Sequence, residues 1–156
     1  MNTITHALLP VLGVYLYRKL KSHEALSLKT YMMIALAGAT PDLLNPHFIL
    51  EARLSSWSHS VFGLLGFSLV VLILSKLKST KLDFNCGWIL ISAYVLHLFC
   101  DAIAGGITFF YPANSLVIGD YYVSAVWWIP IDVAFFLWVY FIWRYPRLRV
   151  GARKRA

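Results

Sequence analysis

The basic residues of this chain fall into three short clusters separated by long apolar stretches, and this arrangement limits what the chain can fold into. Of the 14 Lys and Arg residues, all but Arg53 lie within residues 18–29, 76–81 and 144–155. Hydrophobic residues make up 60% of the chain and charged residues only 13%, whereas soluble domains are about half apolar and about a quarter charged. The sequence therefore predicts an integral membrane protein.

Five apolar segments are expected to form membrane-spanning helices, because a backbone within lipid has to satisfy its own hydrogen bonds. They comprise residues 4–17, 30–44, 60–75, 87–104 and 122–143. The first two are shorter than the roughly 20 residues that cross a typical bilayer, so these helices extend beyond the segments or the bilayer thins around them. The expected fold class is all-α: a polytopic membrane helical bundle in one domain, residues 1–143, followed by a basic cytoplasmic tail, residues 144–156.

The three basic clusters also predict the direction of each span. Cytoplasmic loops of membrane proteins carry an excess of Lys and Arg, and placing all three clusters in the cytoplasm is consistent with five crossings. The N-terminus and the loops at residues 45–59 and 105–121 then lie outside, and the C-terminus lies in the cytoplasm. We interpret the basic tail as this topology signal, so the lipid bilayer is the expected partner and no nucleic acid is expected.

Five His and Asp side chains are predicted to gather at the outer ends of these helices, although only Lys and Arg were used to orient the chain. His97 and Asp101 are spaced i, i+4, so both project from one face of the fourth segment. His6, Asp42 and His59 lie at the outer ends of the first three segments. Ionisable residues within membrane segments are costly and tend to be functional.

Imidazole and carboxylate groups together suit zinc and neighbouring transition metals, and an H-x-x-x-D pair on a helix supplies two ligands to one ion. Five candidates exceed the ligand number of one tetrahedral ion, and a carboxylate can bridge two ions, so one or two divalent metals are expected. A two-metal site would hold an attacking water and the leaving oxygen of a displacement. Individual residues also have structural interpretations: Asp42 in a turn, and Thr5 and Ser58 as helix caps.

Several short motifs occur in the order seen in a family of bacterial proteins. They are T-H at 5–6, P-D-L-L at 41–44, S-H-S at 58–60 and H-L-F-C-D at 97–101, followed by G-G-I-T-F-F-Y-P at 105–112. Through them the chain resembles inner-membrane metal-dependent hydrolase-like proteins, some described as LexA-binding hydrolases. That family is in turn distantly similar to zinc-dependent phospholipase C and the single-strand-specific nucleases. The resemblance implies a multi-pass protein of the bacterial inner membrane.

The resemblance also implies roles for the polar residues at the outer helix ends. The residues that match metal ligands are His6, Asp42, His59, His97 and Asp101. Asp101 matches the carboxylate that bridges two metals, and Asp42 would orient or deprotonate a water, so these two are the implied catalytic residues.

One motif departs from the family. The family's H-R-G-x-T-H-S reads L-S-S-W-S-H-S at residues 54–60, without the first His, the Arg and the Gly. His47 and Arg53 are the candidates to compensate for this loss.

Asp132 falls near the middle of the fifth segment, where an ionised carboxylate is costly and usually faces the interior of a bundle. Three roles stay open for it: joining the site from below, hydrogen bonding to another helix while protonated, or belonging to a transport path. We favour the structural interpretation, because no basic residue is expected at that depth to pair with it.

The sequence and the resemblance together lead to one hypothesis and two alternatives. The hypothesis is a membrane-bound metal-dependent hydrolase of phosphoester bonds, with zinc as the expected metal and a lipid or lipid-linked phosphate as substrate, because the site lies at the bilayer surface. The alternatives are a non-catalytic metal-binding protein that docks a partner and an ion or proton relay through Asp132, His97 and Asp101. A hydrolase needs an open coordination position for water, whereas a structural site is closed by protein ligands.

Overall fold

The computed structural model describes residues 3–46, 50–77 and 84–153. Over these residues the chain forms five α-helices and no strand: α1 (Thr3–Leu20), α2 (Leu28–Leu44), α3 (Val61–Lys76), α4 (Phe84–Ile103) and α5 (Trp128–Arg153). Three 3-10 helices are shorter: η1 (Leu50–Ser55), η2 (Trp57–His59) and η3 (Ala125–Trp127). The all-α prediction is confirmed, and the first four predicted segments agree with α1 to α4 within a few residues at each end.

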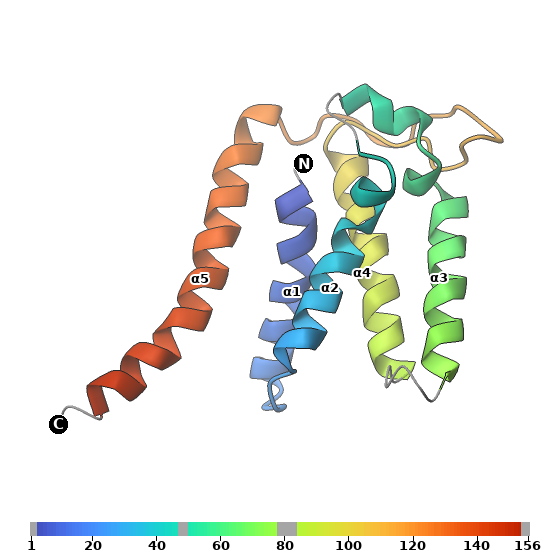
Figure 1. Cartoon of the computed structure of the whole chain (residues 1–156). Helices are drawn as coiled ribbons and strands as arrows, with labels where there is room; N and C mark the ends of the chain where they lie inside the picture. The colour runs from blue at the N-terminus through green and yellow to red at the C-terminus, as the bar shows by residue number, and fades with distance from the viewer. Residues whose placement is uncertain (1–2, 47–49, 78–83, 154–156) are drawn as a thin grey trace.

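Consecutive α-helices run in opposite directions (Figure 1). α1, α2 and α4 pack against one another, α3 lies against α4, and α5 lies against α1. Serines begin two of the helices: Ser27 accepts a hydrogen bond from the backbone N–H of Thr30 (3.1 Å), and Ser60 accepts one from Phe62 (3.2 Å). Such caps satisfy N–H groups that a helix leaves without a partner at its first turn.

The middle of the molecule is apolar. Its buried core comes from α1, α2, α3 and α4 and comprises Val11, Tyr31, Ile34, Ala37, Val71, Leu90, Ile91 and Ala93. This apolar core therefore lies between the two ends of the helical bundle.

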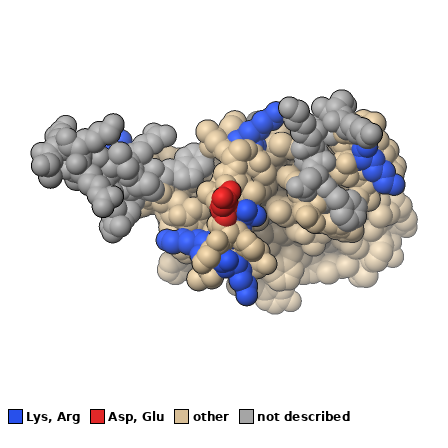
Figure 2. Space-filling view, turned by 90° about the horizontal axis from the view of Figure 1, so that it is seen from below, with Lys and Arg blue, Asp and Glu red and all other residues tan. Residues whose placement is uncertain are grey.

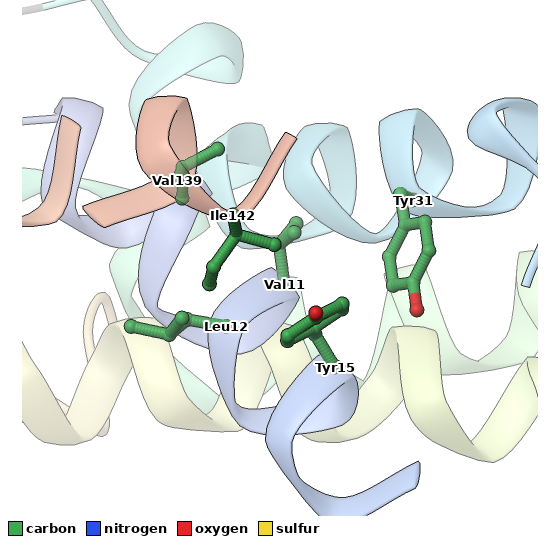
Figure 3. Close-up of a pocket in the computed structure, with 6 residues that line it drawn as sticks. All are labelled: Val11, Leu12, Tyr15, Tyr31, Val139 and Ile142. Atoms are coloured by element: carbon green, nitrogen blue, oxygen red, sulfur yellow. The ribbon is translucent and has the colours of Figure 1, made fainter. Parts of the chain in front are cut away.

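α5 is attached to the other helices along α1. Val139 and Ile142 of α5 and three residues of α1 line a small pocket of about 10 Å³ (Figure 3). That volume is close to the room for one water. Nearer the start of α5, the hydroxyl of Thr5 donates a hydrogen bond to the buried carboxylate of Asp132. Thr5 thus links two helices and does not cap one, and its bond favours the structural interpretation of Asp132.

Basic side chains lie at one end of the molecule. Arg18 and Lys19 are in the last turn of α1, and Lys76 is in the last turn of α3. Figure 2, which views this end, shows Lys and Arg side chains distributed over it. Arg18 also closes the turn between α1 and α2 by donating to the backbone carbonyl of Glu24 (2.7 Å).

Irregular structure from two connections covers the opposite end. η1 and η2 connect α2 to α3, and residues 104–124 cross from α4 towards α5 (Figure 1). Two isolated antiparallel bridges fold the second connection back on itself, one of them between Ile107 and Ile118. The hydroxyl of Thr108 in the second connection donates a hydrogen bond to the carbonyl of Leu54 in η1. The two connections therefore form one layer over the helix ends.

The predicted limits of the fifth segment, residues 122–143, are wrong at both ends, because α5 begins at Trp128 and continues to Arg153. Before α5, the N–H of Val123 donates to the carbonyl of Ile103 (3.2 Å), which ties this stretch to the end of α4. α5 has no break at residue 143, and the division between a helical domain and a tail at that point stays a prediction.

Within the described part of the chain, one helix is long and apolar enough to cross a membrane by its length and composition, at Asn85–Ile103. Two further apolar helices, Val61–Lys76 and Trp128–Ile142, are shorter.

Candidate metal centre

Four side chains from three segments converge below the layer that covers the helix ends. Asp42 lies in the last turn of α2, His59 ends η2, and His97 and Asp101 are one turn apart on α4. One ligand atom from each residue lies within 4.8 Å of those of the other three. The structure therefore brings together four of the five predicted ligands, and this group could hold a metal ion.

Five of the six distances between the donor atoms are close to those around one tetrahedral ion, and all the donor atoms lie within 4.8 Å of one another. Nε2 of His97 lies 3.2 Å from Nε2 of His59, 3.2 Å from Oδ2 of Asp101 and 3.6 Å from Oδ1 of Asp42. Nε2 of His59 lies 3.2 Å from Oδ1 of Asp42 and 3.4 Å from Oδ2 of Asp101. Four ligands at zinc's usual bond lengths are separated from one another by roughly 3.3–3.6 Å.

A backbone carbonyl orients His97. Nδ1 of this ring lies 2.7 Å from the carbonyl oxygen of Gly38. Because a carbonyl oxygen can only accept, Nδ1 carries the hydrogen and Nε2 keeps its lone pair, an assignment made from the hydrogen-bond partner. This is how a second contact commonly orients a histidine that binds a metal.

Serine hydroxyls orient His59 in the same way. Its Nδ1 lies 3.0 Å from Oγ of Ser56 and 3.2 Å from Oγ of Ser58. Ser58 uses its own hydrogen to donate to the carbonyl of Pro41 (2.7 Å), so it accepts from Nδ1 and leaves the lone pair on Nε2. The interpretation of Ser58 as the cap of a helix is wrong for α3, whose cap is Ser60.

The chemistry of this donor set favours a cation at its centre. Two nitrogen lone pairs and two carboxylates are directed at one position. Burial by itself lowers the pKa of His59, but hydrogen bonds and negative charge from Asp101 and Asp42 outweigh it, and the pKa is raised above its ordinary value. The negative charge that favours a proton on His59 would also favour a divalent cation, which carries more positive charge. The residues therefore fit the metal that their types imply.

His6, the fifth predicted ligand, lies beside these four. Its ring stacks on that of His97, with the ring centroids 3.9 Å apart, and its Nε2 lies 3.1 Å from Oδ1 of Asp101. Both ring nitrogens of His6 are buried, and neither has a hydrogen-bond partner among the residues that the structure describes. His6 therefore faces the side of Asp101 that is turned away from His59.

Arg53 contacts the same carboxylate oxygen, which the sequence suggested only as one way to compensate for a lost motif. Its side chain is buried; Nη1 donates to Oδ1 of Asp101 (2.9 Å) and Nη2 donates to the carbonyl of Ala104 (2.6 Å). The other compensation candidate, His47, lies outside the described residues. Arg53 lies on η1, two residues before position 55, where the family motif has its arginine.

Asp42 is the most accessible member of the four. Its side chain is 12% exposed, whereas those of His59, His97 and Asp101 are 0–2% exposed. Its Oδ2 accepts a hydrogen bond from the hydroxyl of Thr3 (2.7 Å), which leaves Oδ1 directed at the two histidines. The Asp42 side is therefore the least buried side of the centre.

Close packing of α1 and α2 positions these groups. A Cβ added at Gly38 would lie 2.2 Å from the backbone oxygen of His6, so the two helices approach this closely only with glycine at position 38. The same glycine provides the carbonyl that orients His97.

The sequence matches the family described as YdjM inner membrane protein over residues 1–155. The match spans all five helices and every residue of the candidate metal centre. No curated protein and no solved structure matches the chain.

Proposed function

We propose that this chain, which belongs to the YdjM inner membrane protein family, is a multi-pass, metal-dependent hydrolase of phosphoester bonds. The observation that carries the proposal is the convergence of Asp42, His59, His97 and Asp101 on one position at one end of the helices. The metal proposed is zinc, because imidazole and carboxylate ligands at this spacing suit it.

All five α-helices are proposed to cross the membrane. Support comes from large apolar side chains exposed along α3 and the apolar part of α5, among them Leu65 and Leu69 of α3 and Val133 and Phe136 of α5. A soluble surface rarely presents such apolar faces. The basic end of the molecule is proposed to face the cytoplasm, which puts the N-terminus and the metal centre outside and the C-terminus inside.

The buried residues His59, His97 and Asp101 are the proposed zinc ligands, and His6 supports Asp101 from its other side. When bound, zinc would lower the pKa of a coordinated water and polarise a phosphoryl oxygen. Asp42 would complete the ligand set in the resting protein and accept the proton of the attacking water on the accessible side. Thr3 assists by holding the second oxygen of Asp42 away from the centre.

The proposed substrate is a lipid or lipid-linked phosphate, and the proposed partner is the bilayer itself. One support is the resemblance to hydrolase-like membrane proteins and, more distantly, to zinc-dependent phospholipase C. Another is the set of exposed aromatic residues at the metal-centre end, Trp57, Tyr121 and Trp127. Trp and Tyr concentrate at membrane–water interfaces, which would put the centre at the depth of the lipid head groups.

A turnover assay tests this proposal. Purified protein loaded with zinc would be mixed in micelles with phospholipids and polyprenyl phosphates, and release of phosphate or head group would be measured. We expect His59→Ala to reduce the rate to background and His23→Ala, in the exposed turn after α1, to leave it unchanged. Stoichiometric zinc with no turnover of any phosphoester would exclude the hydrolase.

That last result would favour a non-catalytic metal site, the alternative for which the structure offers one specific observation. Four protein donors within 4.8 Å of one another can close a zinc site without water, as structural zinc sites do. A relay has no comparable support, because the described core below the centre, between residues such as Val11, Ile34 and Ala93, is apolar.

A further inference from the structure

Asp101 directs its two oxygens at different groups. Oδ2 lies 3.2 Å from Nε2 of His97 and 3.4 Å from Nε2 of His59. Oδ1 lies 2.9 Å from Nη1 of Arg53 and 3.1 Å from Nε2 of His6. A carboxylate that bridges two metals presents one oxygen to each ion, and here a guanidinium occupies the second oxygen.

Arg53 is held in this place by its surroundings. Its side chain is 1% exposed, and Nη2 donates to the carbonyl of Ala104 (2.6 Å). Gly105, the next residue, has φ +121°, and a Cβ there would lie 2.5 Å from Nη2. The connection after α4 is therefore shaped around the guanidinium, which cannot move aside without disturbing that backbone.

Charge also argues against a second ion beside Arg53. Asp42 and Asp101 offset one divalent ion, so Arg53 leaves the centre with a surplus of one positive charge. A second divalent ion would raise the surplus to three, among side chains of His6, Arg53 and Asp101 that are at most 2% exposed. Buried charge of one sign without a partner is strongly unfavourable.

We infer that Arg53 takes the place of a second metal ion, so that the centre holds one divalent ion and Asp101 binds it without bridging. This inference rests on the proposed function only in requiring that the centre binds metal. Arg53 acts as a positioning residue, which keeps Oδ1 of Asp101 occupied and Oδ2 directed at the histidines. This one-metal centre differs from the two-metal arrangement that the family resemblance implied.

The test is metal stoichiometry, measured by elemental analysis of the full chain after titration with zinc in detergent. We expect wild type to saturate at one zinc per chain even with excess metal. Arg53→Lys, which keeps the charge, should also bind one. Arg53→Met exposes Oδ1 of Asp101 and Nε2 of His6 as a pair of ligands, so it should take up a second zinc at high concentration, and adding His6→Ala should return the value to one.

Two zinc ions in wild type, or only one in folded Arg53→Met under all concentrations, would overturn the inference. No zinc in wild type would instead contradict the proposed function, so the two failures are distinct. If Arg53→Met does not fold, cobalt in the wild-type protein still decides the matter. Electron paramagnetic resonance of an isolated cobalt ion supports a single-ion centre, and the signature of a coupled pair refutes it.

Discussion

Nε2 of His59 and Nε2 of His97 lie 3.2 Å apart, although 38 residues separate them in the sequence. Each ring donates its Nδ1 hydrogen elsewhere, His97 to a backbone carbonyl and His59 to serine hydroxyls. Two lone pairs directed at one another need a proton or a metal between them. This contact is the most direct sign that the centre is built for a cation.

Removing one of these rings should abolish tight metal binding. His97→Ala deletes a proposed ligand, and we expect its zinc content after purification to fall well below one per chain. His23→Ala provides the matched control, because His23 lies in an exposed turn at the opposite end. Elemental analysis of both proteins checks this, and equal zinc in wild type and His97→Ala would remove His97 from the site.

Asp101 and Arg53 should be energetically coupled. Asp101→Asn leaves a buried guanidinium without its carboxylate, and breaking one member of such a pair costs about 3–5 kcal/mol. The double variant Asp101→Asn/Arg53→Met removes both charges and should recover much of that stability without recovering metal. The coupling is measured by a double-mutant cycle: thermal unfolding of wild type, the two single variants and the double variant, all metal-free and in one detergent. Strictly additive losses would show that the two side chains do not interact.

Gly105→Ala should destabilise the protein through Arg53. The substitution adds a Cβ at a positive φ and within 2.5 Å of Nη2, so we expect a loss of at least about 2 kcal/mol. Gly13→Ala is the control, because a Cβ there meets nothing within 4 Å and alanine favours a helix by about 1 kcal/mol over glycine. Unfolding temperatures compare the two, and a tolerated Gly105→Ala would contradict the packing described for Arg53.

The contact between Thr5 and Asp132 should matter for stability and not for metal. Thr5→Val removes one hydrogen-bond donor to a buried carboxylate, which costs about 1–3 kcal/mol. Zinc stoichiometry should stay at the wild-type value in Thr5→Val and in Asp132→Asn. Loss of zinc in Asp132→Asn would instead make Asp132 a functional member of the centre.

The proposed orientation can be checked by labelling single cysteines in intact cells and in inverted vesicles. The background would carry Cys86→Ala and Cys100→Ala. Asn114→Cys, in the exposed layer over the metal centre, should react with an impermeant reagent from outside, and His23→Cys only from the cytoplasm. The reverse pattern would invert the topology and put the centre on the cytoplasmic side.

The sequence predicted the helices well because long apolar runs and clustered charges are local signals. The convergence of the His and Asp residues also followed from the sequence, since orienting the helices was enough to bring His6, Asp42 and His97 to one end. The limits of α5 were missed, because the hydrogen bond from Val123 to the end of α4 is a tertiary contact without a local signal.

Arg53 could not be placed from the sequence. It lies in a connection that reads as an outer loop, where an arginine is expected to be solvated, and its carboxylate partner is on α4. The turn of η1 and the fold of residues 104–124 together create its surroundings. The glycine pair at 105 and 106 was the available signal, since both adopt positive φ, but the glycines alone do not reveal which side chain they accommodate.

Gly38 has a consequence for genetic work on this chain. Any side chain at that position would push the backbone of His6 away and shift the carbonyl that fixes the tautomer of His97. A screen for alleles that lose metal should therefore recover substitutions at Gly38 alongside those at the ligands themselves. Such an allele would resemble a ligand mutant in phenotype while leaving every ligand codon intact.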